Sequence, residues 1–403
     1  MPIALLALAI AAFGIGTTEF VMMGVLPQVA SAFDVGIPTA GNLITAYAIG
    51  VVVGAPVLTA LCARLPRKTV LLAMMSLFVV GNVLFALSPT LELGLVFRFI
   101  AGLPHGAFFG AGAIVAAGLV DEGKRGRAVS RMFVGLTLAN VVGVPLGTLL
   151  GQQVGWRATF AVVGGIGVLA MVAIQLLIPD QPAAETVGLR GELAPFRRPQ
   201  VWLALAIVTF GLGGVFASMS YIAPILTDVA GFAPSSVTLL LALTGIGMTI
   251  GVLVGGKLAD RALMPSMYGS LALLGVVLGL FTLTANNKLG AVITLVAIGF
   301  AGFMIGPMIQ ARVMEKAGGN PSMVSAAVQS GFNIANSIGA YFGGMVIAGG
   351  FGLLAPNVVG AALSAIGLAL AVLSGLLDRR DTRAWKRRDA DAEGSAAMAV
   401  AAP

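Results

Sequence analysis

The chain has 403 residues, of which 58% are hydrophobic and only 10% are charged, and its mean hydropathy is +1.02. A typical soluble domain is about one quarter charged, so this composition excludes a soluble globular protein and indicates an integral membrane protein. The apolar runs are continuous over roughly 20 residues rather than alternating over ~10, which excludes a β-barrel. The single cysteine, Cys62, excludes an intrachain disulfide, and neither a metal site nor a cofactor is expected.

Taken in chain order, twelve apolar segments are each long enough to cross a hydrocarbon core of ~30 Å as a helix. The first of them lacks a basic flank and a small-residue cleavage site, so we expect a retained helix rather than a signal peptide. The expected fold class is therefore an all-α membrane protein with twelve transmembrane helices. The predicted spans are residues 3–27, 39–62, 69–88, 93–119, 130–152, 158–178, 201–227, 237–258, 266–285, 290–311, 323–349 and 353–377.

The basic residues are distributed unevenly between the two sides of this predicted bundle. Of the 23 Lys and Arg residues, all except Arg98, Arg157 and Lys288 fall in loops on one side or in the C-terminal tail. The positive-inside rule therefore predicts a multi-pass protein of the cytoplasmic (inner) membrane with both termini cytoplasmic. The net charge of +7 is attributed to this topology signal and to contact with anionic lipid head groups rather than to nucleic acid.

The two halves of the chain repeat each other. A shift of 197 positions lays residues 8–27 on 205–224, with matches that include Phe13 and Pro27, and a shift of 200 lays 95–107 on 295–307. Such a parallel duplication predicts two pseudo-symmetric six-helix bundles, an architecture in which one half can rock against the other around a central site. The predicted domains are an N-terminal bundle (1–178), a cytoplasmic linker (179–200), a C-terminal bundle (201–378) and a cytoplasmic tail (379–403).

Three ionisable residues lie inside predicted spans: Glu19, Arg98 and His105, the only histidine. The shifts place them, in that order, opposite Phe216, Ile298 and Ile305, so the repeated scaffold does not need them. Charged groups in a membrane mark ion or substrate pathways by default. Desolvation favours the protonated form of a carboxylic acid and a nearby guanidinium favours the ionised form, so Glu19 is a candidate proton carrier with Arg98 as its partner.

Two alternatives stay open at this point. Glu19 and Arg98 form either a proton-coupling pair or a fixed ion pair that locks two helices together. His105 is either a proton relay or a hydrogen-bonded helix contact, and without a second ligand in reach it is not a metal site.

The candidate substrate-binding residues combine flexible apolar side chains with intramembrane polar ones. Methionine adapts to varied apolar ligands, and polar side chains spaced at i, i+4 and i+7 share one helix face that should avoid lipid. These candidates are Met22, Met23, Tyr47, Phe109, Asn140, Gln329, Asn333 and Asn336.

The runs "GTTEFVMMGVLPQVA", "AGNLITAYAIGVVVGAPV" and "RFIAGLPHGAFFG" resemble the major facilitator superfamily, and the resemblance covers residues 3–380. More narrowly, the chain is similar to proton-linked efflux proteins of the arabinose-efflux and chloramphenicol-resistance type. The run "VVGVPLGTLLG" resembles the helix-five antiporter motif through Gly143 and Pro145, with Val144 inserted between them. The resemblance also implies that Arg98, on the basic position of the helix-four motif, assists proton transfer.

The loop signature between helices two and three departs from the family pattern. It reads "TALCARLPRK", so Ala63 replaces the acid and Pro66 replaces a glycine, whereas the second half keeps "GKLADR". The cytoplasmic gate that remains possible uses Arg64, Arg67, Lys68, Asp260 and Arg261.

The expected function is proton-coupled efflux (antiport) of small amphipathic drug-like molecules such as chloramphenicol, by alternating access and without enzymatic activity. The proton gradient would supply the energy, and the expected partners are the small-molecule substrate, protons and membrane lipid, with no nucleic acid and a monomeric chain. An exporter of sugars or nucleosides on the same fold is the nearest alternative. A membrane sensor that does not transport is a third, and counterflow of labelled substrate would separate it from a transporter.

Overall fold

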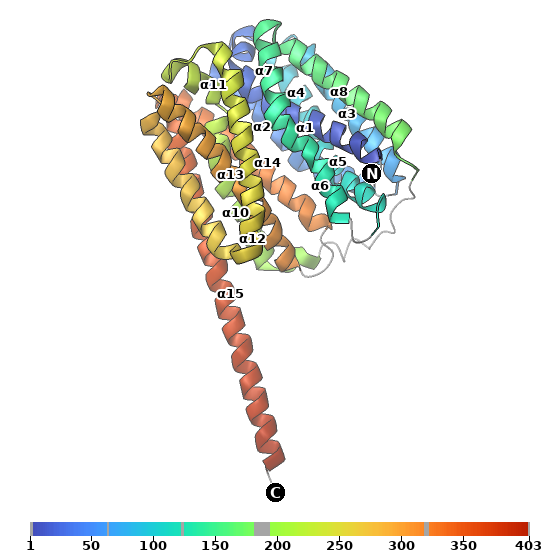
Figure 1. Cartoon of the computed structure of the whole chain (residues 1–403), viewed down its shortest axis with the longest axis vertical. Coiled ribbons are helices and arrows are strands. Elements are labelled where there is room, and N and C mark those ends of the chain that lie inside the picture. Colours follow the sequence, from blue (N-terminus) through green and yellow to red (C-terminus); the bar gives the residue numbers. More distant parts are fainter. Residues whose placement is uncertain (1–2, 63, 122–124, 181–193, 318–321, 402–403) are drawn as a thin grey trace.

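The computed structural model describes residues 3–62, 64–121, 125–180, 194–317 and 322–401, and this part of the chain contains helices and no strand (Figure 1). The first half contains α1 (Ala4–Ala32), α2 (Ile37–Leu61), α3 (Arg67–Ala86), α4 (Leu91–Gly102), α5 (Pro104–Gly118), α6 (Arg125–Leu138), the π-helix η2 (Ala139–Gly143), α7 (Val144–Gln153) and α8 (Trp156–Leu177). The second half contains the 3-10 turn η3 (Ala194–Arg197), α10 (Pro199–Met219), α11 (Ile222–Pro224), the π-helix η4 (Ile225–Val229), α12 (Pro234–Thr284), α13 (Lys288–Ala317), α14 (Ser322–Ala348) and α15 (Ala355–Ala401).

These helices confirm the predicted twelve-span architecture. Ten helices in the described part are long and apolar enough to cross a membrane. One of them, α12, contains two spans that meet at Ala262, whose backbone is non-helical (φ −157°, ψ 79°). The helix α14 matches the remaining predicted span at 323–349. Most of the predicted linker, residues 181–193, lies outside the described residues.

Several spans are interrupted, and prolines sit at the interruptions. Pro104 begins α5 directly after Leu103 ends α4, as expected for a residue without a backbone N–H. Pro145 follows η2, and Pro224 precedes η4. A π turn widens the helix and leaves a backbone carbonyl without its usual partner, and such turns are common at functional sites.

The glycines at helix crossings recur under a single shift of 197 positions. A Cβ at Gly50 or Gly54 would meet the backbone oxygen of Phe99 or Leu103, and a Cβ at Gly247 or Gly251 would meet that of Val296 or Phe300. The pair Gly102 and Tyr47 is repeated in the same way by Gly299 and Thr244. The fourth predicted span, which is formed by α4 and α5, and the tenth, which lies in α13, therefore correspond at a shift of 197.

The predicted shift of 200 for these two helices is consequently wrong by three residues, nearly one helical turn. The short match of "LVFRFIAGLPHGA" on "LVAIGFAGFMIGP" favoured an alignment that is displaced by about one helical turn. It did so because small residues recur at similar spacing in both helices. Arg98 thus corresponds to Leu295 and His105 to Gly302, rather than to Ile298 and Ile305. Both ionisable residues still lack an ionisable counterpart.

Besides a small cluster of Tyr47, Val51 and Ala101, two large apolar clusters form most of the buried core. One cluster joins the whole second half to part of the first, namely Phe20–Ala30 of α1, the start of α2 and Phe85, Trp156 and Phe160. The other contains only residues of the first half, from Ala4 to Ile15 of α1 and the facing parts of α3, α5 and α8. We call these the shared cluster and the separate cluster.

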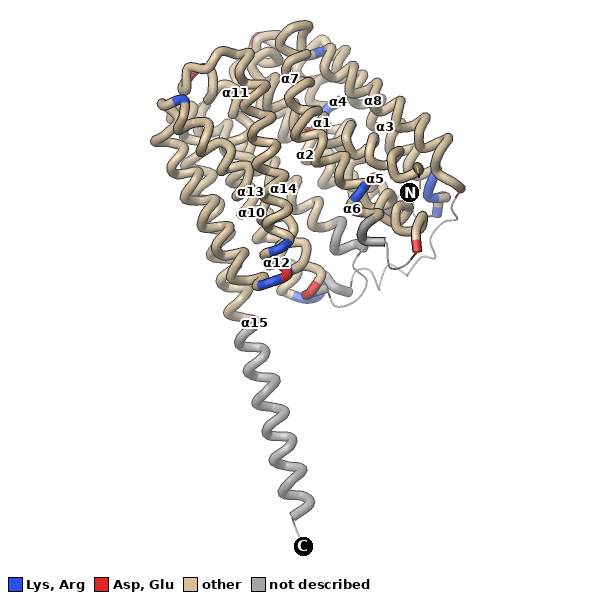
Figure 2. The backbone as a smooth tube through the Cα atoms, in the orientation of Figure 1, with Lys and Arg blue, Asp and Glu red and all other residues tan. Residues whose placement is uncertain are grey.

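The charged residues mark the two ends of the bundle. In Figure 2 the Lys and Arg residues gather mainly at the end from which α15 extends, which we call the basic end. The opposite end, which we call the far end, holds the short connections at residues 33–36, 154–155 and 285–287. The shared cluster reaches the far end in the first half, whereas the separate cluster lies toward the basic end.

Candidate functional site

Glu19 lies in the middle of α1 and is 2% exposed. Its Oε1 atom is buried and has no hydrogen-bond partner within the described residues. A buried polar atom without a partner costs about 1–3 kcal/mol, and more when it is charged, so the position is unfavourable for stability alone. Packing therefore does not explain why a carboxyl group occupies this position.

Arg98, on α4, is fully buried and bound by helices one and two. One guanidinium nitrogen donates to Thr18 Oγ1 at 3.1 Å, another donates to the Thr18 carbonyl at 3.3 Å, and Nε donates to the Leu43 carbonyl at 3.4 Å. The guanidinium also lies 4.4 Å from the centre of the Tyr47 ring, a cation–π distance. Each of the three guanidinium nitrogens of Arg98 thus has a partner. Two of them are bound by Thr18, the residue before Glu19, and the third is bound by Leu43.

Glu19 and Arg98 do not form an ion pair in the described structure, although they lie close enough to attract each other electrostatically. The fixed ion pair that the sequence left open is therefore absent from this conformation. The arginine is instead held one residue away, on Thr18.

His105 extends this polar group toward α5. Its Nδ1 lies 3.1 Å from the Tyr47 hydroxyl, and its ring centre lies 5.1 Å from that of Phe109. Arg98 and His105 therefore both contact Tyr47, Arg98 over its ring and His105 at its hydroxyl, as their seven-residue spacing along one stripe predicts. The helix contact, one of the two alternatives for His105, is present, and the group continues from Arg98 through Tyr47 to His105.

Two members of this group were missed from the sequence. Thr18 donates to Asn82 Oδ1 at 2.5 Å, and Asn82 on α3 donates to the Phe78 carbonyl at 2.9 Å. A buried asparagine in an otherwise apolar helix and a threonine next to the intramembrane acid were the signals available, since both are polar within a span.

A small cavity of about 30 Å³ lies between the two halves and is lined on helix one by Phe20, the residue after Glu19, with room for one or two water molecules. Helix one contributes Phe20 and Met23, and the π turn η2 contributes Asn140. The second half contributes Phe216, Met219, Thr244 and Met248 among others. The predicted substrate residues Met23 and Asn140 therefore face the boundary between the halves.

The remaining predicted substrate residues lie elsewhere among the described residues. Met22 is buried in α1, and Tyr47 and Phe109 belong to the Arg98 group. On α14, Asn333 donates to the Gln329 carbonyl at 3.1 Å, while both amide atoms of Asn336 are buried without a partner. The polar stripe of α14 thus faces the protein interior, as predicted, but not this cavity.

Four phenylalanines close the space around the cavity. Phe20 of the first half stacks on Phe216 with ring centres 6.3 Å apart, and it meets Phe303 edge-on at the same distance. Phe332 contacts Phe216 and Phe303, with ring centres 5.1 and 6.1 Å away. This aromatic group joins the halves at mid-membrane.

Direct contacts between the halves also occur at the far end. Gln152 Nε2 donates to the Pro234 carbonyl at 2.9 Å. Gly41 leaves room for the Tyr221 hydroxyl, which donates to the Ala340 carbonyl at 2.6 Å. The far end is therefore closed by one hydrogen bond between the halves and by the close approach of Gly41 and Tyr221, in addition to the shared cluster.

The predicted gating residues do not join the halves in the described structure. Arg64, Asp260 and Arg261 are exposed, and Lys68 pairs with Asp180 at 3.4 Å. Arg67 is half-buried and has a partner of its own, and no ion pair links Asp260 to Arg64 or Lys68 among the described residues. Gly143 and Pro145 lie at the η2 turn, where Gly143 makes room for Thr17 and Phe13 of α1.

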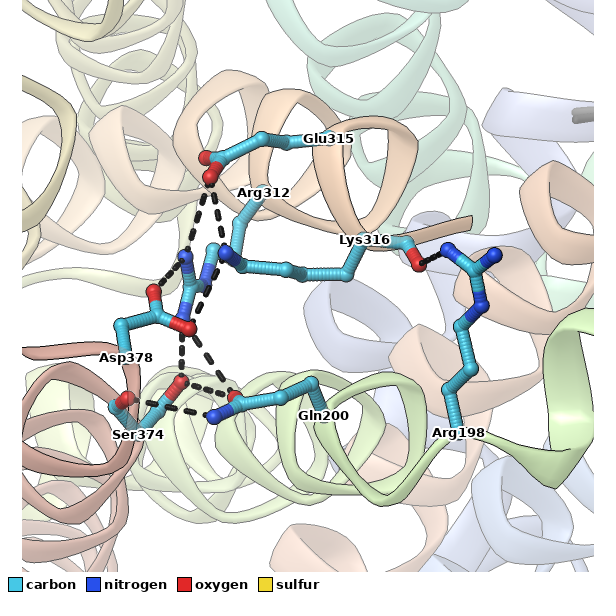
Figure 3. Close-up of polar contacts among 7 residues, drawn as sticks. All are labelled: Arg198, Gln200, Arg312, Glu315, Lys316, Ser374 and Asp378. Atoms are coloured by element: carbon cyan, nitrogen blue, oxygen red, sulfur yellow. Dashed lines mark hydrogen bonds and ion pairs between the residues drawn. The ribbon is translucent and has the colours of Figure 1, made fainter. Parts of the chain in front are cut away.

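A second buried charge, Arg312, was missed because its place near a predicted loop suggested a solvated residue. It is 1% exposed and pairs with Asp378 at 2.6 Å, while its other nitrogen donates to Ser374 Oγ at 2.7 Å (Figure 3). Lys316 pairs with Asp378 at 3.0 Å and with Glu315 at 2.9 Å. This Arg312 cluster ties the end of α13 and the middle of α15 to Gln200 of α10.

Comparison of the sequence and fold with known proteins identifies the family of this chain. The model described as "Major Facilitator Superfamily" matches residues 8–327. A bacterial homologue of the human lysosomal transporter Spinster, in an inward-facing and unoccupied conformation, has the same fold, with a TM-score of 0.74, 16% identity, and coverage of 92% of this chain and 96% of that one.

Three relatives match over nearly their whole length. The inner membrane transport protein YdhP of Escherichia coli K12 is 44% identical over 370 residues, which are 92% of this chain and 95% of the relative. The putative transporter AraJ of the same strain is 36% identical over 375 residues, with coverage of 93% and 94%. A chloramphenicol resistance protein of Streptomyces lividans is 34% identical over 378 residues, with coverage of 92% and 96%. The chain therefore belongs to the major facilitator superfamily, a family of membrane transporters rather than enzymes.

Proposed function

We propose that this protein exports small, amphipathic, largely uncharged molecules from the cytoplasm in exchange for protons, with the proton gradient as its only energy source. The observation that carries the proposal is the buried Glu19 carboxyl without a hydrogen-bond partner, beside an Arg98 that is bound to Thr18 instead. A carboxyl group in this environment can be protonated without breaking an ion pair. Its charge then depends on where Arg98 lies.

The character of the substrate is inferred from the walls of the central cavity. Phe20, Met23, Phe216, Met219 and Met248 present apolar and adaptable surface, and Asn140 adds an amide. Such a lining suits ligands that are mainly apolar and carry a few polar groups. The relatives that include a chloramphenicol resistance protein support a substrate of this kind.

In the proposed cycle, substrate enters from the cytoplasm and a proton leaves Glu19 to the same side. Protonation of Glu19 from the periplasmic side then favours release. In this scheme the protein is a monomer of the inner membrane. Both termini and the linker at 179–200 are cytoplasmic. Residues 1–178 and 201–378 are the two halves that move against each other. The basic end is then cytoplasmic, and the joined far end fits the inward-facing branch of the cycle.

The test is transport in proteoliposomes by the purified Glu19→Gln variant. We expect the variant to lose drug accumulation driven by a pH gradient while it retains exchange of labelled for unlabelled drug. Glu92→Gln is the matched control, because Glu92 is an exposed glutamate at the start of α4. Gradient-driven transport by Glu19→Gln at the wild-type rate would exclude Glu19 as the proton carrier.

An exporter of sugars or nucleosides is the second candidate, and one observation favours it. Asn336 corresponds to Asn140 at a shift of 196, which also pairs Gly143 with Gly339 and Gly147 with Gly343. Both amide atoms of Asn336 are buried without a partner. Each half thus carries an amide at the corresponding position, which would suit a polyhydroxylated ligand. Counterflow with labelled pentose, nucleoside and chloramphenicol separates the two candidate functions.

A further inference from the structure

An open groove of about 590 Å³ lies between the basic ends of α10 and α15, away from the central cavity. Its volume is within the roughly 300–1,000 Å³ of small-molecule sites. The turn η3 closes one side of the groove, and most of the lining is apolar: Phe196, Trp202, Leu203, Ala206, Leu373 and Leu377. One charged residue, Arg197, also lines it.

The Arg312 cluster holds the two walls of this groove together from the inner side. Ser374 on α15 donates to Gln200 Oε1 at 2.8 Å, and Gln200 on α10 donates to the Ser374 carbonyl at 3.4 Å (Figure 3). Trp202 lies two residues after Gln200, a rotation of roughly 200° around the helix, and therefore points away from the cluster. Trp202 is 59% exposed and Leu373 is 45% exposed, so the groove opens on the outside of the bundle.

Trp202 also holds the turn η3, which forms the third side of the groove. Trp202 Nε1 donates to the Phe196 carbonyl at 2.7 Å, and the two ring centres are 5.9 Å apart. Tryptophan and other amphipathic aromatic side chains are typical of the level where hydrocarbon meets the lipid head groups. The groove therefore begins at the membrane surface and continues along α10 into the hydrocarbon.

Arg197 stands at the mouth of the groove and is exposed, with no hydrogen bond or ion pair to any described residue. Its neighbour Arg198 differs, because it donates to the Lys316 carbonyl at 3.0 Å. A free guanidinium offers paired donors that match the oxygens of a phosphate group. The mouth of the groove is thus positively charged and the interior is apolar.

We propose that this groove binds an anionic phospholipid, with one acyl chain between α10 and α15 and the phosphate on Arg197. The apolar walls open toward the bilayer, where acyl chains are the available ligand. The positive mouth lies at the level of the head groups and selects negative charge. The site belongs to the outer surface of the second half and does not depend on the transported substrate.

The experiment uses the full chain with Trp156→Phe and Trp385→Phe, which leaves Trp202 as the only tryptophan. The protein is reconstituted in phosphatidylcholine vesicles that contain a minor fraction of either brominated-chain phosphatidylglycerol or brominated-chain phosphatidylcholine, and quenching of Trp202 fluorescence is measured. We expect phosphatidylglycerol to quench at about fivefold lower mole fraction, the factor for one basic residue at an anionic membrane surface. Arg197→Gln should abolish this preference, and Arg197→Lys should retain most of it.

Arg261→Gln is the matched control, because it removes an exposed basic residue at the same end but on α12, and it should keep the preference. Equal quenching by the two lipids in the parent protein would overturn the proposal, as would a preference that survives Arg197→Gln. Absence of quenching by either lipid would also overturn it, because the groove would then be filled by the protein itself. None of these readouts involves transport, so their failure is distinct from failure of the proposed antiport.

Discussion

Thr18 on α1 donates its hydroxyl hydrogen to Asn82 Oδ1 on α3, at 2.5 Å in the interior of the first half. With its hydrogen committed to Asn82, the Thr18 oxygen presents its lone pairs to Arg98, which donates to it at 3.1 Å. Asn82 and Thr18 together hold the guanidinium on the hydroxyl and carbonyl of Thr18 rather than on the Glu19 carboxyl. Two neutral side chains thus control the distance between the only buried charges of this region.

The first prediction concerns Thr18→Val, which keeps the shape of the side chain but removes the acceptor for Arg98. Arg98 should then turn to Glu19 and favour its ionised form, so the pH optimum of gradient-driven transport should move to more acidic values. A hydrogen bond to a charged group is worth about 1.5–3 kcal/mol, so thermal stability should fall as well. Transport between pH 5 and 8, measured in proteoliposomes, tests the shift.

Two matched variants control this experiment. Thr17→Val removes only a bond to the Phe13 carbonyl and should leave the pH profile unchanged. Thr18→Ser restores the hydroxyl and should return the profile to that of the parent. A Thr18→Val profile identical to that of the parent would show that Thr18 does not position Arg98.

The second prediction concerns the crossing of α2 and α4. A Cβ at Gly54 would collide with the backbone of Leu103, which cannot move aside as a side chain can. Gly54→Ala should therefore destabilise the protein by about 1–3 kcal/mol, the range for overpacked cores. Gly110→Ala is the control, because no atom lies within 4 Å of a Cβ there, and the gain in helix propensity should stabilise α5 by up to about 1 kcal/mol.

Unfolding in detergent, followed by the reaction of Cys62 with a thiol-reactive dye, measures both changes. Cys62 is half-buried and is the only cysteine in the chain. Opposite shifts of the midpoint are expected. A Gly54→Ala protein as stable as the parent would refute the close approach of these helices.

The third prediction concerns the Arg312 cluster. Arg312→Ala would remove the ion pair between Arg312 and Asp378 and would leave the hydroxyl of Ser374 without its donor. Removing one partner of a buried pair costs about 3–5 kcal/mol, and because Asp378 is 25% exposed we expect the lower end of this range. Lys316→Ala, at a residue 21% exposed, should cost less than about 1 kcal/mol. Comparable losses for the two variants, measured as unfolding midpoints in detergent, would contradict the central place of Arg312.

The fourth prediction tests the closed far end. In a Cys62→Ser background, cysteines at Gln152 and Pro234 should be joined by a short cleavable bifunctional thiol reagent, since the parent side chain and carbonyl are 2.9 Å apart. Cross-linking should stop transport, and cleavage of the linker should restore it, because alternating access requires this end to open. Each single-cysteine protein treated in the same way serves as the control. Full transport by the cross-linked protein would exclude an opening between Gln152 and Pro234.

The positions of the helices were predictable because they follow from the hydropathy of the sequence alone. The expected span 39–62 is α2 (Ile37–Leu61), and the expected span 158–178 is α8 (Trp156–Leu177). The boundary at Ala262 within α12 was also found from sequence, because charged residues separate the two apolar runs there. The π turn at Ala139–Gly143 was not, since a single asparagine and a glycine two residues before a proline occur in unbroken membrane helices as well.

The members of the site were largely predictable, but their partners were not. Glu19 and Arg98 stand out as charges in apolar helices, and the seven-residue spacing from Arg98 to His105 gives their common face. Which acceptor Arg98 chooses depends on side-chain geometry within a few tenths of an ångström, and several acceptors on α1 and α2 compete for it. Burial of Arg312 likewise follows from the meeting of three helices, which no local pattern encodes.

The shared cluster ties the second half to the first at the far end as well as around Phe20, and this has a thermodynamic consequence. To open the far end, the protein must bring apolar side chains such as Val25, Leu26 and Tyr221 into contact with water. Exposing apolar surface to water raises the heat capacity, and the free-energy cost of that exposure falls on cooling. The balance between the two access states should therefore vary with temperature in a curved rather than linear manner, and cold should loosen the far end first.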